Sequence, residues 1–181
     1  PADYIVNYLS GNLTITKAQL IAKADSLTRN YGDPNPALTI TYSGFVNGDD
    51  ETDIVKPIAT TAAVPTSNIG NYPISLTGGS AANYTISLQN GNLTVTKASL
   101  IVTANTKYIN KGSSVPTLNA TITGWKNNDQ NTVTCGPTFS VPVGCNQSAG
   151  VYTISVCCLS FTKMNNYTIT YQTGLLYINP K

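Results

Sequence analysis

The sequence contains no histidine, and charged side chains make up only 10% of its 181 residues. Without histidine the chain lacks the commonest general base and the commonest metal ligand, and it cannot form a Ser-His or Cys-His nucleophile pair. Gly78-Gly79 lacks the lysine and the spacing of a phosphate-binding loop. We therefore expect no enzymatic activity and no cofactor. The net charge of +2 comes without a basic cluster, so we expect no nucleic-acid partner.

Long apolar runs are also missing, and no segment approaches the roughly 20 residues of a membrane-spanning helix. We expect no membrane span. No signal peptide is visible and the first residue is Pro1, which favours a mature fragment or an excerpt of a longer chain. Hydrophobic residues reach 41%, and β-branched and aromatic residues are plentiful, so the chain can form packed cores and is not of a disordered type.

What the sequence does contain is an internal repeat. Residues 82–100, ANYTISLQNGNLTVTKASL, match residues 2–20 at an offset of 80 residues, which relates Tyr4 to Tyr84. They match residues 165–181 at an offset of 83, which relates Tyr84 to Tyr167. Because self-similarity at a fixed period indicates a repeat architecture, we predict two full modules, 17–97 and 98–181. Residues 1–16 are then the terminal hairpin of a preceding module, or a segment donated to another molecule, and we expect them not to remain unpaired.

Each module has the pattern of an all-β, sandwich-like unit of short strands separated by turns. Strands are predicted at 20–24, 38–42 and 70–76, with counterparts 80 residues later. Asn90-Gly91 lies between two alternating runs and predicts a β-hairpin. Residues 48–54 are the one candidate for a short helical turn. No flexible linker separates the modules at 97–100, so we predict an elongated rod in which neighbouring modules stabilise each other.

Four aromatic residues recur as pairs at the repeat spacing and are predicted to anchor the cores. Phe45 corresponds to Trp125, and Tyr72 corresponds to Tyr152. Buried aromatic side chains dominate the packing of small cores. A role as a platform for a ligand is the alternative for Phe45 and Trp125.

Three motifs of the first module occur in a fixed order: YGDPNPALTITYSGFVNGDD, GNYPISLTGGSAANYTIS and NGNLTVTKA. With these motifs the module resembles the MBG domain of the YGX type, found in tandem in large secreted bacterial surface proteins and adhesins. The resemblance implies a β-grasp-like module in an extracellular stalk at the cell surface, and it implies no catalytic residues. The second module departs from it, since Lys111-Gly112-Ser113-Ser114 replaces Tyr-Gly-Asp-Pro.

The carboxylates cluster at one place, Asp49, Asp50, Glu51 and Asp53. Several oxygen ligands at short spacing are what Ca²⁺ requires, so the cluster is a weak calcium candidate. The alternative is a solvated turn, and we favour it because the spacing does not match a calcium-binding loop. Paired-carboxylate hydrolysis is not expected.

All four cysteines lie in the second module, at Cys135, Cys145, Cys157 and Cys158. An even number in a secreted-looking chain favours disulfides, while a zinc site and free buried thiols are the alternatives. Neighbouring residues of a strand point to opposite faces, so Cys157 and Cys158 should have different partners unless they bond to each other. We predict that the strand after Thr132 pairs with the strand after Gly150, which would place Cys135 opposite Cys157 or Cys158. Cys145 would pair with the remaining one.

Three functions are compatible with the sequence. The first is a structural segment of an extracellular adhesin, stalk or fibre, whose partners are neighbouring modules or identical subunits. The second is an adhesive module that binds a glycan or a surface protein through exposed tyrosine and asparagine side chains. The third is a filament subunit, in which residues 1–16 add strands to a neighbouring molecule.

Overall fold

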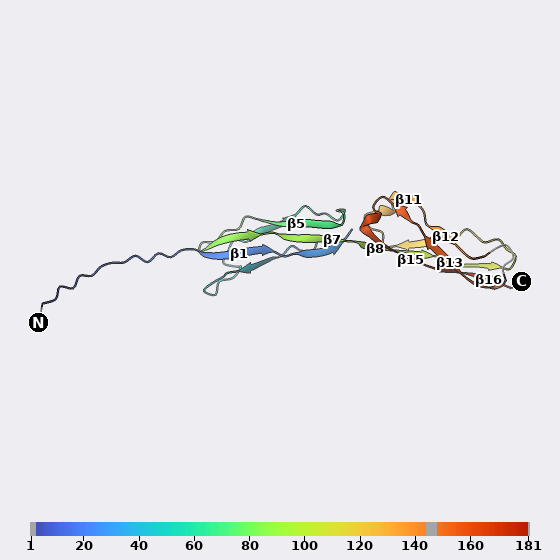
Figure 1. Ribbon diagram of the computed structural model, residues 1–181. Coiled ribbons are helices and arrows are strands. Elements are labelled where there is room, and N and C mark those ends of the chain that lie inside the picture. The colour runs from blue at the N-terminus through green and yellow to red at the C-terminus, as the bar shows by residue number, and fades with distance from the viewer. Residues whose placement is uncertain (1–2, 144–147, 181) are drawn as a thin grey trace.

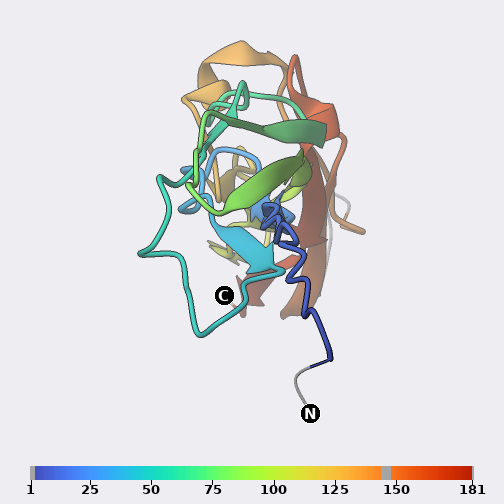
Figure 2. The same cartoon turned by 90° about the vertical axis from the view of Figure 1, so that its left-hand side faces the viewer.

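The computed structural model describes residues 3–143 and 148–180 and consists almost entirely of β-strands. The molecule is elongated: residues 3–16 extend from one end of the first module, and the second module forms the other end (Figure 1). Seen along the long axis from the end that carries residues 3–16, the first module lies in front of the second (Figure 2). The predicted all-β class is confirmed.

The first module has seven strands in two sheets. They are β1 (Ala18–Ala24), β2 (Leu27–Asn30), β3 (Ile40–Ser43), β4 (Ile58–Thr61), β5 (Gly70–Thr77), β6 (Tyr84–Gln89) and β7 (Gly91–Thr96). One sheet has the order β3-β1-β6 and the other has the order β2-β7-β5-β4. The pairs β1–β6 and β2–β7 are parallel, whereas β1–β3, β4–β5 and β5–β7 are antiparallel.

The second module repeats this arrangement and adds two short strands and two 3₁₀ turns. Its elements are β8 (Ala98–Ala104), β9 (Lys107–Asn110), β10 (Ala120–Thr123), η1 (Asp129–Thr132), β11 (Val133–Cys135), β12 (Thr138–Ser140), β13 (Gly150–Cys157), β14 (Ser160–Phe161), η2 (Met164–Asn166), β15 (Tyr167–Gln172) and β16 (Gly174–Asn179). Its sheets have the orders β10-β8-β15, β12-β13-β16-β9 and β11-β14.

The strand order is the same in both modules, since β8, β15 and β16 take the places of β1, β6 and β7. The prediction that both copies share one topology is therefore confirmed. We retain 17–97 and 98–181 as the proposed module boundaries.

The predicted hairpin at Asn90-Gly91 is wrong. β6 pairs with β1 in one sheet, whereas β7 pairs with β2 and β5 in the other, so the chain continues from one sheet into the next instead of reversing. A Cβ atom at Gly91 would lie 2.5 Å from the carbonyl oxygen of Ala24. The glycine is present because two backbones come close together where the chain changes sheets.

Residues 48–54 form turns in the first module rather than a helical turn. The carboxylate of Asp50 accepts hydrogen bonds from the Thr52 N–H (2.7 Å) and hydroxyl (2.6 Å), and Asp53 accepts one from the Asp50 N–H (2.9 Å). Such local side-chain bonds compete with helical backbone bonding. The corresponding part of the second module forms the 3₁₀ turn η1.

Residues 3–16 form no strand in this structure, and their apolar side chains face solvent. Tyr4, Ile5 and Leu9 are at least 90% exposed, and Leu13 and Ile15 are close to that value. Among the described residues, no helix is long and apolar enough to cross a membrane.

Candidate functional site

One hydrophobic core extends across the boundary between the two modules. Tyr31 and Val95 belong to the first module, and they are 1% and 2% exposed within a cluster otherwise formed by buried residues of the second module. Tyr72 is half-buried and packs against the cores of both modules. Because apolar side chains are shared, the modules cannot separate without exposing core surface to water.

Two tyrosines meet at the centre of this junction. The rings of Tyr31 and Tyr167 are arranged edge to face, with their centroids 5.5 Å apart. The Tyr167 hydroxyl donates to the buried carboxylate of Asp129 (2.8 Å) and accepts from the N–H of Lys126 (3.0 Å). Burial, and then the hydrogen bond to Asp129, raise the pKa of Tyr167 far above its ordinary value. The phenol therefore stays protonated and remains a donor.

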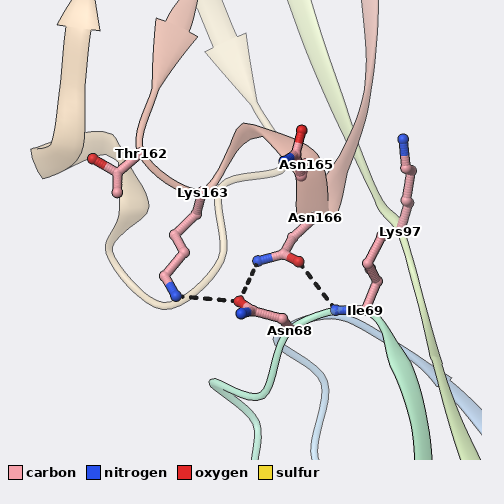
Figure 3. A pocket seen from close by; sticks show the side chains of 7 residues that line it. All are labelled: Asn68, Ile69, Lys97, Thr162, Lys163, Asn165 and Asn166. Carbon is pink, nitrogen blue, oxygen red and sulfur yellow. Dashed lines mark hydrogen bonds between the residues drawn. The ribbon is translucent and has the colours of Figure 1, made fainter.

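A polar cluster closes one side of the junction, around a cavity of about 510 Å³ (Figure 3). The amide of Asn166, which is 3% exposed, accepts from the Ile69 N–H and donates to the Asn68 side chain, both at 3.0 Å. Lys163 donates to the same Asn68 oxygen at 3.1 Å. The Asn166 side chain thus satisfies a backbone N–H of the other module, which would be costly to bury alone.

Two further contacts lie at the periphery. Lys126 forms a half-exposed ion pair with Asp33 (2.8 Å) and holds the pKa of that carboxyl below its usual value. The Asn127 side chain donates to the carbonyl oxygen of Pro65 (3.3 Å). An ion pair this exposed adds little stability, so we assign it a part in alignment rather than in holding the modules together.

The end of the first module that lies opposite the junction repeats the contacts that the second module contributes to the junction. The Tyr84 hydroxyl donates to Asp49 (2.7 Å) and accepts from the Val46 N–H (3.1 Å), as Tyr167 does with Asp129 and Lys126. The Phe45 ring packs edge to face on Tyr84, with centroids 5.6 Å apart. From the sequence, Tyr84 and Tyr167 marked the repeat and Asp49 belonged to the calcium candidate, but no tyrosine was paired with an aspartate. The recurrence of both residue types at the repeat spacing was the available signal.

The four predicted anchors are half-buried in the structure. Trp125 packs on Phe161 and Tyr167, with ring centroids 4.9 Å and 6.2 Å away. Tyr72 and Tyr152 each donate their hydroxyl to the carbonyl four residues earlier, at 2.9 Å and 3.0 Å. Each tyrosine thus fixes the chain segment that leads into β5 or β13.

The four acidic residues of the calcium candidate do not converge on one point. Asp49 accepts from Tyr84, while Asp50 and Asp53 accept hydrogen bonds within their own turn. Glu51 pairs with Lys56 at 3.0 Å. Within residues 3–143 and 148–180, no group of three metal-binding side chains is assembled. In this structure the cluster is a hydrogen-bonded turn that does not bring its carboxylates together, and we do not propose it as a calcium site.

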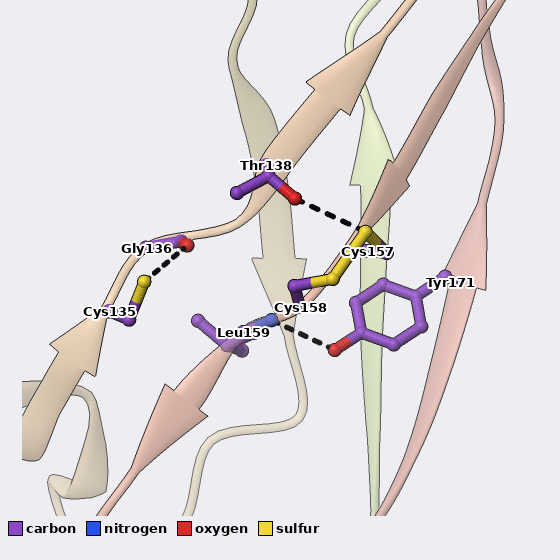
Figure 4. Close-up of a disulfide and its surroundings, with 7 residues drawn as sticks. All are labelled: Cys135, Gly136, Thr138, Cys157, Cys158, Leu159 and Tyr171. Carbon is purple, nitrogen blue, oxygen red and sulfur yellow. Dashed lines mark hydrogen bonds between the residues drawn. A yellow bond between two sulfur atoms is a disulfide. The ribbon is translucent and has the colours of Figure 1, made fainter.

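The predicted bridge from Cys135 to Cys157 or Cys158 is also wrong. The strand opposite Cys157 is β12, where Thr138 is its partner, whereas Cys135 lies in β11 opposite Ser160. Cys157 and Cys158 bond to each other, and Cys135 is exposed and has no disulfide partner among the described residues (Figure 4). Cys145, and the turn about Gln147, lie outside the described residues.

A stacked pair of tyrosines, one exposed and one half-buried, lies on the second module. Tyr108 of β9 and Tyr177 of β16 are register partners whose rings stack at 4.9 Å, with 9° between their planes. Tyr108 is 68% exposed. In the first module, Thr28 and Thr94 are the register partners at these places.

The chain was also compared with known proteins. The MBG domain (YGX type) family model matches residues 20–94 and again residues 100–177. No curated protein matches the chain. Since the two matches together cover most of the chain, the protein belongs to the MBG domain family of the YGX type and contains two tandem copies of that domain.

Proposed function

We propose that this chain is a stiff, non-catalytic spacer segment of an extracellular bacterial surface protein of the adhesin or stalk type. MBG domains of this type are repeat modules of surface proteins. A spacer must keep its length, and its modules must therefore not move freely against each other.

The observation that carries this proposal is the shared core at the junction. Tyr31 and Val95 are buried in the second module's hydrophobic cluster, and Asn166 of the second module is hydrogen-bonded to the first. Independent domains joined by a linker usually meet through smaller and more polar surfaces. Lys97 alone separates β7 from β8, so the backbone adds no hinge.

The experiment measures whether the modules tumble together. NMR relaxation on the full chain should give one rotational correlation time and one diffusion axis for both modules, and small-angle scattering should give the extended length of a docked pair. Antibodies raised against the chain should label intact cells of the source organism. Two different correlation times, or labelling only after lysis, would contradict the spacer proposal.

A second candidate function is binding of a glycan by the second module. The supporting observation is the exposed ring of Tyr108 stacked on the half-buried ring of Tyr177, because aromatic faces offer amphipathic contact to sugar rings. A glycan array should show binding that the double variant Tyr108→Thr/Tyr177→Thr loses, since this variant carries the residues of the first module. Equal signals from both proteins would exclude the platform.

We do not propose strand donation into a second copy of this chain. Residues 3–16 repeat the sequence of β6 and β7, and each described module already contains those strands, as β6–β7 or as β15–β16. Donation would have to displace β6 from β1 and β7 from both β2 and β5, or their counterparts in the second module.

A further inference from the structure

The end of the first module that residues 3–16 lead into has the structure of a docking face without its partner. At the junction, Tyr167 and Asp129 receive Tyr31. At the free end, Tyr84 and Asp49 form the same hydrogen-bonded pair, with a similar geometry.

Burial of the polar residues differs between the two places in the way that a missing partner would produce, whereas Tyr84 and Tyr167 are both almost fully buried, at 4% and 3% exposed. Asn166 is 3% exposed, whereas its counterpart Asn83 is exposed. Asp129 is 6% exposed, whereas its counterpart Asp49 is half-buried. The Asn166 amide makes two hydrogen bonds across the junction. The Asn83 side chain makes none within the described residues, although its backbone carbonyl bonds to Ala18 as part of the fold.

A cavity of about 490 Å³ lies at this end. Val46, Asn47, Asp49 and Tyr84 line it on the module side, and Ile15 to Ala18 line it on the side of the entering chain. Asn47 has the same left-handed backbone as Asn127, with φ values of 59° and 52°. At the junction, the Asn127 side chain reaches the carbonyl of Pro65 in the neighbouring module.

We propose that this face binds the loop end of another MBG module of the first module's type. That loop end carries a tyrosine at the position of Tyr31 and an asparagine at the position of Asn68. The tyrosine ring would pack on Tyr84 beside Asp49, and the asparagine with its following N–H would bond to Asn83. The inference rests on the proposed spacer function and names the surface through which the spacer continues.

The covalent connection favours this partner over other occupants of the face. Residues 3–16 match residues 83–96 at a constant offset, and they enter β1 as directly as residues 83–96 enter β8. A module completed by residues 3–16 would therefore dock on the first module in the same way as the first module docks on the second. The ion pair of Lys126 has no counterpart at this face, because Val46 occupies the place of Lys126 and cannot pair with an aspartate.

The experiment extends the full chain by placing a second copy of residues 17–80 in front of residue 1. Residues 1–16 then take the place of residues 81–96 in the added module. Hydrogen exchange should show that residues 3–16 lose their fast exchange and approach the slow rates of 84–96. NMR signals of Asn47, Asn83 and Tyr84 should shift, and the added module should share the correlation time of the others.

Three variants make the test specific. Asn83→Ala should leave the 181-residue chain unchanged but loosen the added module in the extended chain. Val46→Lys should increase the ratio of docked to undocked forms by about two- to fivefold, the range of an exposed ion pair. The third variant is an extension with residues 98–163, which carry Lys111 and Ser148 in place of Tyr31 and Asn68. This added module should protect residues 3–16 from exchange but should dock more weakly on the first module.

The outcomes separate the two proposals. If residues 3–16 become protected while Asn83 and Tyr84 keep their signals, the docking face is wrong and the stiff junction of the present chain is unaffected. If residues 3–16 stay unprotected in both extensions, the proposed partner is wrong as well. If the unextended chain itself shows two correlation times, the spacer function fails before the docking face is tested.

Discussion

The hydroxyl group of Tyr167 connects a buried carboxylate to a backbone N–H at the place where the two modules meet. Asp129 has no cationic side chain among its hydrogen-bond partners in the described residues, and the phenol is the donor that satisfies it. Tyr42 offers a contrast, because its buried hydroxyl has no hydrogen-bond partner among the described residues. The two hydroxyl groups should therefore contribute to stability with opposite sign.

Tyr167→Phe should lower the free energy of unfolding by about 1–3 kcal/mol, because it leaves the Asp129 carboxylate without its donor. Urea titration followed by fluorescence measures this. Tyr42→Phe is the control and should be neutral or slightly stabilising, since it removes a polar group that is buried without a partner. Because both variants keep the aromatic ring, equal losses would show that the hydrogen bond to Asp129 makes no specific contribution to stability.

Stability should fall at alkaline pH. Burial is the first cause of the raised pKa of Tyr31, Tyr42 and Tyr167. An unfolded tyrosine ionises near pH 10, so above that pH the unfolded chain releases protons that the folded chain retains. The stabilisation is complete below about pH 10 and is lost as the pH rises through the folded pKa values. Unfolding titrations from pH 7 to 11.5 should show this decline, and Tyr167→Phe should make it shallower.

The vicinal disulfide occupies a turn that the first module makes without it. Cys158 has a φ of 69°, and Gly78 has 71° at the equivalent position. The double variant Cys157→Thr/Cys158→Gly recreates Thr77-Gly78. It removes a side chain from the left-handed region, a conformation that costs most residues about 1–2 kcal/mol. A bridge between neighbours closes almost no loop and restricts the unfolded chain little. The double variant should be as stable as the parent or more so in thermal unfolding; a clear loss would show that the bridge itself is needed.

At the scale of elements, the repeat was readable from the sequence because core strands need alternating apolar residues at fixed places. Pairing partners were harder to predict. Asn90-Gly91 has the composition of a hairpin turn, but the deciding contact is with Ala24, far away in sequence. The error over Cys135 has a similar origin, since the pairing Thr138↔Cys157 repeats Ile58↔Thr77 of the first module and is a long-range contact that the local pattern does not show. The junction was missed because local patterns do not show which loop reaches a neighbouring module.

Gly91→Ala and Gly174→Ala should each destabilise the protein by about 1–3 kcal/mol, because the added methyl would be forced against the carbonyl of Ala24 or Ala104. Chemical denaturation measures the loss. Gly136→Ala is the matched control, since its added methyl would meet no atom of the described residues within 4 Å. A control as damaging as the other two would remove close approach as the explanation.

At the scale of the whole molecule, Asn166 should control both stability and stiffness. Asn166→Ala removes two hydrogen bonds across the junction and leaves the Ile69 N–H unsatisfied, so we expect a loss of about 1–3 kcal/mol. NMR relaxation should also show the modules beginning to move independently. Asn83→Ala at the free end should change neither quantity. Unchanged relaxation in Asn166→Ala would mean that the shared core alone aligns the modules.

The parallel pairing of β1 with β6 and of β2 with β7 has a consequence for a chain stretched between a cell and its target. Tension would enter the first module at β1 and leave it through β7. β1 and β2 lie alongside β6 and β7 in parallel, so opposite forces on the two ends load both ladders in shear. All their hydrogen bonds then resist together, instead of opening one after another as in a peeled hairpin. The same geometry recurs in β8–β15 and β9–β16, and each module should yield only at high force and as a single event.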